Sequence, residues 1–472
     1  MALVVAVVGA GPSGVYAAEA LTRRPGREHL DVRVAVLDRL PVPFGLVRYG
    51  VAPDHPSIRS IRSTLERTLD APGVTFYGDV QVGRDLSVAE LRASVDAVVY
   101  AYGAGSDRRL GIEGEELPGS VSAPELVTWY TGHPDVHPDT GGAAPGHPWV
   151  PGLLSSASDV VVVGAGNVAL DVVRVLVRGV DELSATDMPD EVLDALRSRT
   201  VRDVHVLARR GPAYTAFTTK ELRELGELAE VDVVVDPGDL VLDESSRLVA
   251  EQDKVAARNL AVLAEWAGRA ATGAAHRVHL HFWTSPSAIR GTDAVEAVEV
   301  TRSAVGHDGL VRPVGEPWTL PAQLCVRAVG YRGLPLPGAP YDESTGRVPH
   351  SEGRVIRDGA FSPGEYATGW IKRGPTGVVG TNRSDAAETV ACLLDDVDAG
   401  VLVPTADPDA LATLLGARGV HPLGMPEWHR IDAAELLRGQ RHGRQRTTLA
   451  HRAELLDAAG ATAGADDEVP GA

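Results

Sequence analysis

The chain has 472 residues, of which 44% are hydrophobic and 23% charged, a composition typical of a folded globular protein with two or three domains. Its 64 acidic and 45 basic residues give a net charge of -19, which argues against general affinity for nucleic acid because phosphate binding depends on lysine and arginine. No run approaches the ~18–20 apolar residues of a membrane span. We therefore expect that the protein neither binds nucleic acid nor inserts into a membrane.

The first residues predict a complete βαβ unit. Leu3–Val8 is a short apolar run rich in valine, typical of a strand buried on both faces of a parallel sheet. No basic region precedes this run, so we predict a first strand and not a signal peptide. The run Gly9-Ala10-Gly11-Pro12-Ser13-Gly14 follows, then apolar residues at helical spacing, then a second strand over Asp31–Leu37 that ends at Asp38.

This glycine run fits the dinucleotide fingerprint. One glycine makes the tight turn, one lets the backbone approach a pyrophosphate, and one lets helix and strand pack closely. Asp38 stands 24 positions after Gly14, close to the ~20 expected for a carboxylate that binds a ribose hydroxyl. An acid here disfavours a 2′-phosphate, so the ligand is FAD or NAD, and analogy with flavoproteins that hold two nucleotides favours FAD. The alternative is a tight turn with a structural role alone.

A second unit of the same kind starts at the strand Asp159–Val163. The run Gly164-Ala165-Gly166-Asn167-Val168-Ala169 follows, with alanine in the third glycine position, and the next strand is predicted over Asp203–Leu207. Where an NAD enzyme carries an acid, this chain has Arg209 and Arg210. A guanidinium forms two charge-assisted hydrogen bonds with a phosphate, so the pair favours the 2′-phosphate of NADPH. The other interpretation is a solvated basic strand end.

The remaining pattern completes an α/β protein. Strands are predicted at Ala97–Tyr100, Ala322–Val329, Glu365–Thr368, Val278–Phe282 and Val295–Thr301, helices at Asp181–Arg199, Arg247–Ala271 and Asp385–Asp398, and a loop over Thr131–Gly152. We predict two Rossmann-like three-layer nucleotide-binding domains, the second inserted into the first: residues 1–107 and 331–458 for FAD, residues 108–330 for NADP. Residues 459–472 are predicted to be a disordered tail.

The two cysteines, Cys325 and Cys392, exclude a disulfide framework, an iron–sulfur cluster held within the chain and a C-x-x-C redox motif. They fit a reducing cytosol, so a cytoplasmic location is expected. The histidines show no H-E-x-x-H or paired-ligand spacing, so no metal site is predicted. A chain that binds FAD and NADPH without C-x-x-C is expected to pass hydride from nicotinamide to flavin.

Several further segments are too specific for generic loops, among them PFGLVRYGVAPDHP, FYGDVQVGRD, GEELPGS, FTTKELREL, VGYRG and GWIKRGPTGVVGTN. With GAGPSG, GAGNVALDVVRVL, ARRGP and TSP, they resemble the adrenodoxin-reductase-type ferredoxin–NADP reductases, including their mycobacterial branch, over nearly the whole chain. The resemblance implies a flavoprotein with an FAD and an NADP domain, each built on a three-layer Rossmann-like sheet. It departs from many members in having Asp38 where they have glutamate.

The resemblance also implies site residues. For FAD these are Gly9, Ala10, Gly11, Pro12, Gly14, Asp38, Leu46, Val82, Trp370, Gly377, Val378 and Val379, the last four around the isoalloxazine. For NADP they are Gly164, Ala165, Gly166, Asn167, Val168, Arg209, Arg210, Glu221 and Gly377. His55 and Glu221 are the titratable candidates beside the nicotinamide. Each has a plainer interpretation: Trp370 as core packing, His55 as a structural hydrogen-bond donor, Glu221 as a solvated helix residue.

The function implied is an FAD-dependent NADPH:ferredoxin reductase that passes single electrons to a ferredoxin or adrenodoxin-like iron–sulfur protein, which feeds cytochrome P450s in some systems. A monomer is expected from the family fold. An acidic ferredoxin requires a local positive face on this acidic chain, for which Arg197, Arg199, Arg202, Arg223 and Arg258 are candidates. The alternatives are a flavin-dependent NADPH oxidase or monooxygenase, and a redox sensor that binds flavin and NADPH without catalysis.

Overall fold

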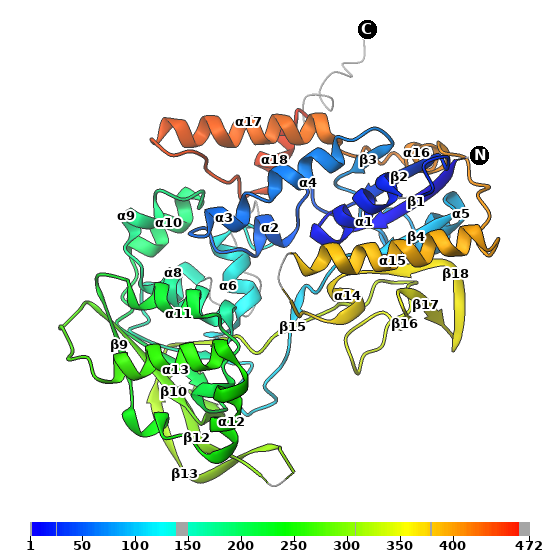
Figure 1. Cartoon of the computed structure of the whole chain (residues 1–472). Helices are drawn as coiled ribbons and strands as arrows, with labels where there is room; N and C mark the ends of the chain where they lie inside the picture. Colours follow the sequence, from blue (N-terminus) through cyan, green and yellow to red (C-terminus); the bar gives the residue numbers. More distant parts are fainter. Residues whose placement is uncertain (1, 25, 138–149, 307, 378–379, 462–472) are drawn as a thin grey trace. The chain divides into compact units, whose positions relative to one another are not determined.

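The computed structural model describes residues 2–24, 26–137, 150–306, 308–377 and 380–461 (Figure 1). The chain divides into two compact units. The first comprises residues 1–51, 55–106 and 331–472, and the second comprises 52–54 and 107–330. The chain passes between them at the short strands β5 (Ser106–Asp107) and β15 (Tyr331–Arg332). Among the described residues, no helix is both long and apolar enough to cross a membrane.

The first unit is built on a mixed seven-stranded sheet with the order β16-β17-β18-β4-β1-β2-β3. Strands β1 to β4 and β18 are parallel, and β16 and β17 are antiparallel. The bounds are β1 (Leu3–Val8), β2 (Val32–Leu37), β3 (Val74–Tyr77), β4 (Ala97–Tyr100), β16 (His350–Ser351), β17 (Arg354–Arg357) and β18 (Ala360–Ala367). β1 lies between β2 and β4, so the sheet order reverses at the end of β1, where open α/β sheets bind ligands.

Helices cover both faces of this sheet because both faces of its central strands are apolar. Leu3, Val5 and Val7 belong to one buried cluster, and Val4, Ala6 and Val8 to the other. The helices are α1 (Pro12–Arg23), α2 (Leu46–Tyr49), α3 (Pro56–Arg59), α4 (Arg62–Leu69), α5 (Val88–Ser94), α14 (Trp370–Arg373), α15 (Thr381–Asp398), α16 (Ala410–Ala417), α17 (Met425–Arg441) and α18 (Arg452–Ala459). α1 and α15 pack side by side on the first face, and α5 and α16 pack on the second (Figure 1).

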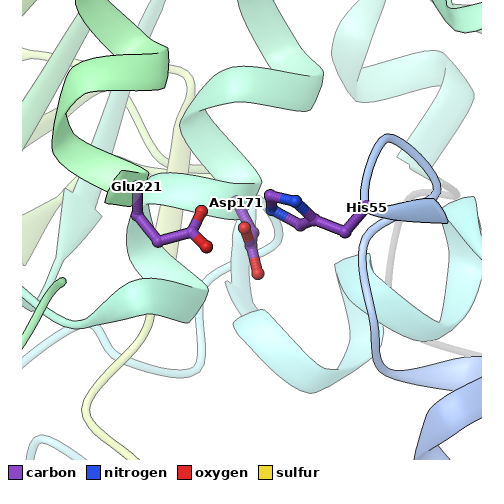
Figure 2. Close-up of side chains that lie close together, drawn as sticks. All are labelled: His55, Asp171 and Glu221. Atoms are coloured by element: carbon purple, nitrogen blue, oxygen red, sulfur yellow. The ribbon is translucent and has the colours of Figure 1, made fainter. Parts of the chain in front are cut away.

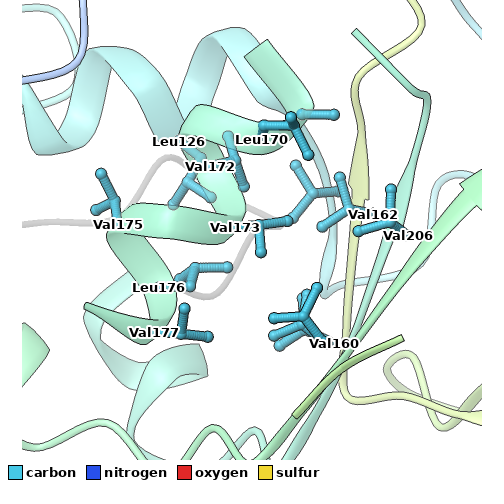
Figure 3. Packing of buried hydrophobic residues seen from close by; sticks show 14 of the residues in the cluster. Leu126, Val160, Val162, Leu170, Val172, Val173, Val175, Leu176, Val177 and Val206 are labelled. Atoms are coloured by element: carbon cyan, nitrogen blue, oxygen red, sulfur yellow. The ribbon is translucent and has the colours of Figure 1, made fainter. Parts of the chain in front are cut away.

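The second unit is built on a fully parallel six-stranded sheet, ordered β6-β14-β7-β8-β10-β9. Its strands are β6 (Ser120–Ser122), β7 (Asp159–Val163), β8 (Asp203–Ala208), β9 (Val231–Val235), β10 (His276–Phe282) and β14 (Leu324–Arg327). One face is covered by helices, and Figure 3 shows how α8 (Asn167–Val177) inserts Leu170, Val173 and Leu176 against Val160 and Val162 of β7.

The opposite face of the parallel sheet carries a second sheet instead of helices. The antiparallel strands β11 (Thr284–Arg290), β12 (Ala297–Val305) and β13 (Val311–Pro321) bury Val298 and Val300 against Val161, Leu207 and Cys325. The other helices of the unit are α6 (Ala123–Tyr130), α7 (Val150–Leu154), α9 (Val180–Leu183), α10 (Asp190–Arg197), α11 (Thr219–Gly226), α12 (Glu244–Gln252) and α13 (Lys254–Ala267), with 3₁₀ turns at Pro212–Tyr214 and Pro237–Leu240. Both units are therefore three-layered α/β structures.

Some predicted elements have different bounds. The helix predicted over Arg247–Ala271 is two helices, because Asp253 is extended and its carboxylate accepts hydrogen bonds from the backbone N–H groups of Val255 and Ala256, which starts α13. The loop predicted to reach Gly152 ends earlier, since α7 begins at Val150. Residues 138–149 of that loop and 462–472 of the predicted tail lie outside the described residues, while Ala459 ends α18.

A buried ion network connects α2 to the C-terminal helices of the first unit. Glu435 on α17 is fully buried and accepts from Arg48 on α2, from Arg446 Nη1 at 2.7 Å and from the Leu449 N–H at 2.9 Å. The guanidinium of Arg48 also lies over the rings of Tyr49 and Trp428. Burial alone raises the pKa of Glu435, but the positive charges of Arg48 and Arg446 outweigh it and lower the pKa to about 2.

This network predicts acid sensitivity. Since the folded pKa of Glu435 lies below its unfolded value, its stabilisation is present above about pH 5 and is lost as the pH falls toward 2. Glu435→Gln removes one negative charge from beside the buried arginines, so we expect the free energy of unfolding to fall by about 3–5 kcal/mol at neutral pH. We also expect the stability of this variant to depend less on pH in the acid range. Urea unfolding at a series of pH values measures both.

The matched control is Glu454→Gln. Glu454 pairs with Arg438 in a half-exposed ion pair at 2.9 Å, so its loss should cost less than about 1 kcal/mol and leave the pH profile unchanged. Equal stability and equal acid sensitivity of the two variants would refute the role given to Glu435.

Candidate functional site

The first glycine run forms a tight turn between β1 and α1. Gly9 has a φ of +111°, and a Cβ at Gly14 would overlap the carbonyl oxygen of Gly9, so the helix lies against the strand at a distance that only glycine allows. Gly11 is extended and caps α1, and a Cβ there would meet only the Cα of Gly45, at 3.9 Å. Pro12 is at the first helical position, where it needs no N–H partner. The helix N-terminus is thus arranged to receive a phosphate.

Asp38 ends β2 beside this turn. Its Oδ2 accepts from the backbone N–H of Ala10 at 2.8 Å, and its Oδ1 accepts from that of Leu40 at 3.0 Å. Burial raises the pKa of Asp38, although these backbone donors oppose the rise. The side chain is therefore fixed next to the glycine turn, at the position predicted for a ribose contact.

The segment Thr368–Gly374 meets the glycine turn from β18. A Cβ at Gly369, which has a φ of +75°, would overlap the hydroxyl of Ser13, whose Oγ donates to Asn382 Oδ1 on α15 at 3.0 Å. Asp385 on α15 accepts from the N–H of Gly369 at 2.5 Å and pairs with Lys372 at 3.0 Å. These contacts fix α14, which starts at Trp370, against the glycine turn.

Trp370 is partly exposed, so core packing does not account for it fully. Its ring lies 5.3 Å from that of Tyr331 at an interplanar angle of 48°. Gly377 has a φ of +82°, and a Cβ there would approach the Thr381 side chain at the start of α15. Leu46 begins α2 and is half-buried, whereas Val82 is buried in the core. Val378 and Val379 lie outside the described residues.

The second glycine run has the same geometry with one difference. Gly164 has a φ of +132°, and a Cβ there would overlap the carbonyl of Ala328. Gly166 is extended at the start of α8 and has open space around it, as a phosphate loop requires. The third position is occupied by Ala169, whose methyl group is fully buried in the helix-side core, so this turn has room for a small side chain there. Asn167 Oδ1 accepts from the Thr218 N–H at 2.8 Å, which ties the loop to α11.

Arg209 and Arg210 are both exposed where β8 ends. In the described part of the chain, neither guanidinium has an ion pair or hydrogen bond, and that of Arg210 lies 5.6 Å from the ring centre of Tyr214. Tyr214 in turn meets Trp283 edge to face, at 6.3 Å. Two free guanidinium groups in this position suit a doubly charged phosphate. Sequence reasoning missed Tyr214 and Trp283, because no motif marks the residues that surround the pair.

Glu221 is buried, so it is not a solvated helix residue. It lies in the first turn of α11, and its Oε2 accepts from Nη1 of Arg174 at 3.0 Å. Arg174, on α8, is itself buried and also donates to Asp171 at 2.7 Å and to Asp54 at 2.5 Å. Figure 2 shows the carboxylates of Asp171, on α8, and Glu221, on α11, close together, with the Glu221 side chain pointing toward Asp171. Arg178 also donates to Asp54, at 2.7 Å.

This cluster unites distant parts of the sequence in one unit. Asp54 belongs to the second unit, although the residues on both sides of 52–54 belong to the first. His55 directly follows it, is buried and forms the N-cap of α3, where its carbonyl accepts from the N–H groups of Ile58 and Arg59. The signal for Arg174 in the sequence was an arginine inside the apolar run DVVRVLV, whereas Asp54 stood in a motif without an assigned partner.

The arginines predicted to form a basic face do not all come together. Arg223 and Arg258 line one hollow with Lys220, Glu224 and Glu227. Arg197 pairs with Asp194 at 2.5 Å, and Arg199 donates to backbone carbonyls instead of facing solvent freely. Of the predicted set, only Arg223 and Arg258 share this hollow, where Lys220 adds a positive charge and Glu224 and Glu227 add negative ones, while Arg202 is exposed outside it.

Comparisons with known proteins agree with this geometry. A family model described as pyridine nucleotide-disulphide oxidoreductase matches residues 3–235. The chain is 43% identical over 468 residues to the NADPH-ferredoxin reductase FprA of Mycobacterium tuberculosis, with 96% of this chain and 98% of that protein covered. It is 38% identical over 468 residues to the mitochondrial NADPH:adrenodoxin oxidoreductase of Mus musculus, with coverage of 96% and 90%.

A solved structure, Mycobacterium tuberculosis FprA in complex with NADPH, matches with a TM-score of 0.89 at 43% identity and covers 97% of this chain and 100% of that chain. The name of the family model mentions disulfide chemistry, but the two cysteines of this chain do not form a disulfide. Cys325 and Cys392 are both free thiols, and burial raises the pKa of Cys325 to about 12, which makes it unreactive.

The first glycine turn gives a direct prediction. In Gly14→Ala, the added methyl group overlaps Gly9, and relief of this clash displaces α1 from the phosphate position at a cost of about 1–3 kcal/mol. We expect FAD affinity to fall about 5- to 150-fold. The flavin content of the purified protein and a fluorescence titration of the apoprotein measure it. Gly416→Ala on α16, where a Cβ meets open space, should keep full flavin content; equal flavin content in both variants would contradict the prediction.

The buried guanidinium of Arg174 gives a prediction about stability. Arg174→Met leaves buried carboxylates without their cation, so we expect a loss of about 3–5 kcal/mol in the free energy of unfolding. Arg174→Lys keeps the charge without the planar fork and should lose less. In the control Arg197→Met, an exposed pair is lost, at a cost below about 1 kcal/mol. Urea unfolding followed by circular dichroism ranks the variants, and similar losses in Arg174→Met and the control would be inconsistent with this assignment.

Proposed function

Because the chain belongs to the family of NADPH-ferredoxin and NADPH:adrenodoxin reductases, we propose that it is an FAD-dependent reductase that takes hydride from NADPH and passes single electrons to a ferredoxin. One observation carries the proposal: a single chain holds two glycine turns of the dinucleotide type, the first followed by an acid and the second by two arginines that have no ion pair among the described residues. An acid favours a nucleotide without a 2′-phosphate, and the arginines favour one with it.

The first unit fits FAD. The turn from Gly9 to Gly14 offers a helix N-terminus to the pyrophosphate, and Asp38 is held beside it for the ribose. Trp370 stands on the segment that α15 fixes against this turn, and Gly377 precedes α15 in the sequence, next to the Thr381 side chain; both positions suit an isoalloxazine contact. We extend the assignment to Ala10, Gly11, Pro12, Leu46, Val82, Val378 and Val379. When bound, FAD accepts a hydride and releases its electrons singly, which the chain's own side chains cannot do.

The second unit fits NADPH. Gly164, Gly166 and the first turn of α8 suit the pyrophosphate, while Arg209 and Arg210 suit the 2′-phosphate. Tyr214 fixes the guanidinium of Arg210 from one side, which limits the freedom that binding would otherwise remove. Ala165, Asn167, Val168, Glu221 and Gly377 complete the proposed set of contacts.

His55 and Glu221 are proposed to hold or move a proton near the nicotinamide. Both are buried, and Glu221 is oriented by a hydrogen bond from Arg174. A positioned carboxylate whose charge is balanced by a guanidinium can accept a hydrogen bond without a large desolvation cost. Arg174 therefore acts on this chemistry through Glu221, as a positioning residue.

The proposed partner is a ferredoxin or adrenodoxin-like iron–sulfur protein, docked transiently. The relatives are named for such partners, and the hollow with Arg223, Arg258 and Lys220 offers positive charge to an acidic surface. We also propose that the protein works as a cytoplasmic monomer and that its electrons reach cytochrome P450s through the ferredoxin.

Stopped-flow mixing with NADPH and with NADH, followed at the flavin absorbance band, tests the nucleotide assignment. We expect faster flavin reduction by NADPH. In the double variant Arg209→Ala, Arg210→Ala, the kcat/KM for NADPH should fall at least about 100-fold while that for NADH changes little, because each charge-assisted bond contributes about 1.5–3 kcal/mol. Arg312→Ala, which removes an exposed arginine on β13, should change neither.

Cytochrome c reduction with and without added ferredoxin tests the acceptor. Reduction that depends on ferredoxin supports the reductase. A flavin that NADPH does not reduce would leave a nucleotide-binding protein without catalysis, and electrons that pass only to oxygen would indicate an oxidase or monooxygenase.

A further inference from the structure

Three histidines gather on one face of the parallel sheet in the second unit. His205 lies on β8, and His279 and His281 lie on β10, the strand beside it, with His279 directly opposite His205. The rings of His205 and His279 stack with centroids 4.6 Å apart, and those of His205 and His281 lie 5.2 Å apart. All three are half-buried, on the face opposite the helices. The proposed chemistry uses none of them.

Two ring nitrogens in this group face each other at hydrogen-bonding distance. Nδ1 of His205 and Nε2 of His281 are 3.0 Å apart. Imidazole nitrogens bind transition metals at about 2.0–2.1 Å, so two of them on one ion lie roughly 2.9 Å apart at a right angle and roughly 3.3 Å apart in a tetrahedron. The observed separation corresponds to a right angle.

We propose that Nδ1 of His205 and Nε2 of His281 form a binding site for a divalent transition-metal ion of square or tetragonal preference, Cu²⁺ or Ni²⁺, with water in the remaining positions. Imidazole is a suitable ligand for both ions, and both favour right angles between nitrogen ligands. The ion takes the place of the proton that the two rings otherwise share.

A neutral imidazole has one nitrogen with a hydrogen and one with a lone pair, and the hydrogen bond between the two rings places a hydrogen on one of the facing nitrogens. A metal ion that binds both nitrogens therefore displaces this hydrogen, which moves to the other nitrogen of the same ring or to solvent.

The third histidine and the nearby charges have other partners. His279 Nε2 bonds Asp203 at 2.8 Å, so this ring supports His205 by stacking and is not assigned as a ligand. Arg277 pairs with Asp203 at 2.5 Å, and Arg302 pairs with Asp239 at 2.6 Å, so neither cation faces the site without a counter-charge. Asp236 adds a negative charge near His281.

The test uses the FAD-loaded enzyme after removal of any histidine tag. Calorimetric titration with NiCl₂ should show a site of one ion per chain that the double variant His205→Gln, His281→Gln lacks, with an affinity loss of at least about 100-fold. With Cu²⁺, the electron paramagnetic resonance spectrum should show hyperfine coupling to two nitrogens, absent from the double variant. Bound Ni²⁺ connects β8 to β10 and should raise the melting temperature of the wild type alone.

Two controls keep the outcome decisive. His429→Gln removes an exposed histidine that bonds Asp70, so it should bind Ni²⁺ like the wild type. The double variant must retain its flavin content and its NADPH-dependent turnover, because neither histidine belongs to the proposed nucleotide sites. Equal Ni²⁺ affinity in the wild type and a folded double variant, or no binding to the wild type at about 1 mM Ni²⁺, overturns the proposal.

Discussion

The fold depends on how closely a helix can approach the strand before it. In the first unit, α1 lies so near β1 that the third glycine position has no room for a Cβ, and the helix N-terminus is brought to the carboxyl end of the central strand. In the second unit, Ala169 occupies the same position, and its side chain is buried in the helix-side core. The third position must be glycine in the first unit because a side chain there would overlap the carbonyl oxygen of Gly9, whereas the second unit has room for the methyl group of Ala169.

Charge then separates two turns that are otherwise alike. Asp38 is held by the backbone N–H groups of Ala10 and Leu40, and an acid in that place repels a phosphate. Arg209 and Arg210 stand at the corresponding strand end of the second unit with their guanidinium groups free in the described structure. The chain as a whole is strongly acidic, so anion recognition here depends on these local groups and on helix N-termini rather than on net charge.

Sequence reasoning predicted features that depend on neighbours along the chain and missed those that depend on distant partners. The predicted bounds of Leu3–Val8, Ala97–Tyr100 and Asp159–Val163 agree with β1, β4 and β7, because buried parallel strands are continuous apolar runs between turns. The antiparallel sheet over the second unit was not predicted as a layer, since its long edge strand β13 is mostly exposed and carries prolines and glycine. Likewise, the break at Asp253 depends on one side-chain cap within a continuous helical pattern.

The same distinction applies to the site. The glycine turns and the arginine pair are local patterns, whereas the partners of Arg174 come from α8, α11 and a three-residue segment more than a hundred positions away. A buried arginine in an apolar helix is costly unless carboxylates surround it, so its presence in the sequence requires acids elsewhere in the fold. Asp54 is one of these acids, and the guanidinium that binds its carboxylate also orients Glu221. Arg174 therefore orients Glu221 through a side-chain hydrogen bond and also holds the carboxylate of Asp54, the residue that precedes His55 in the sequence.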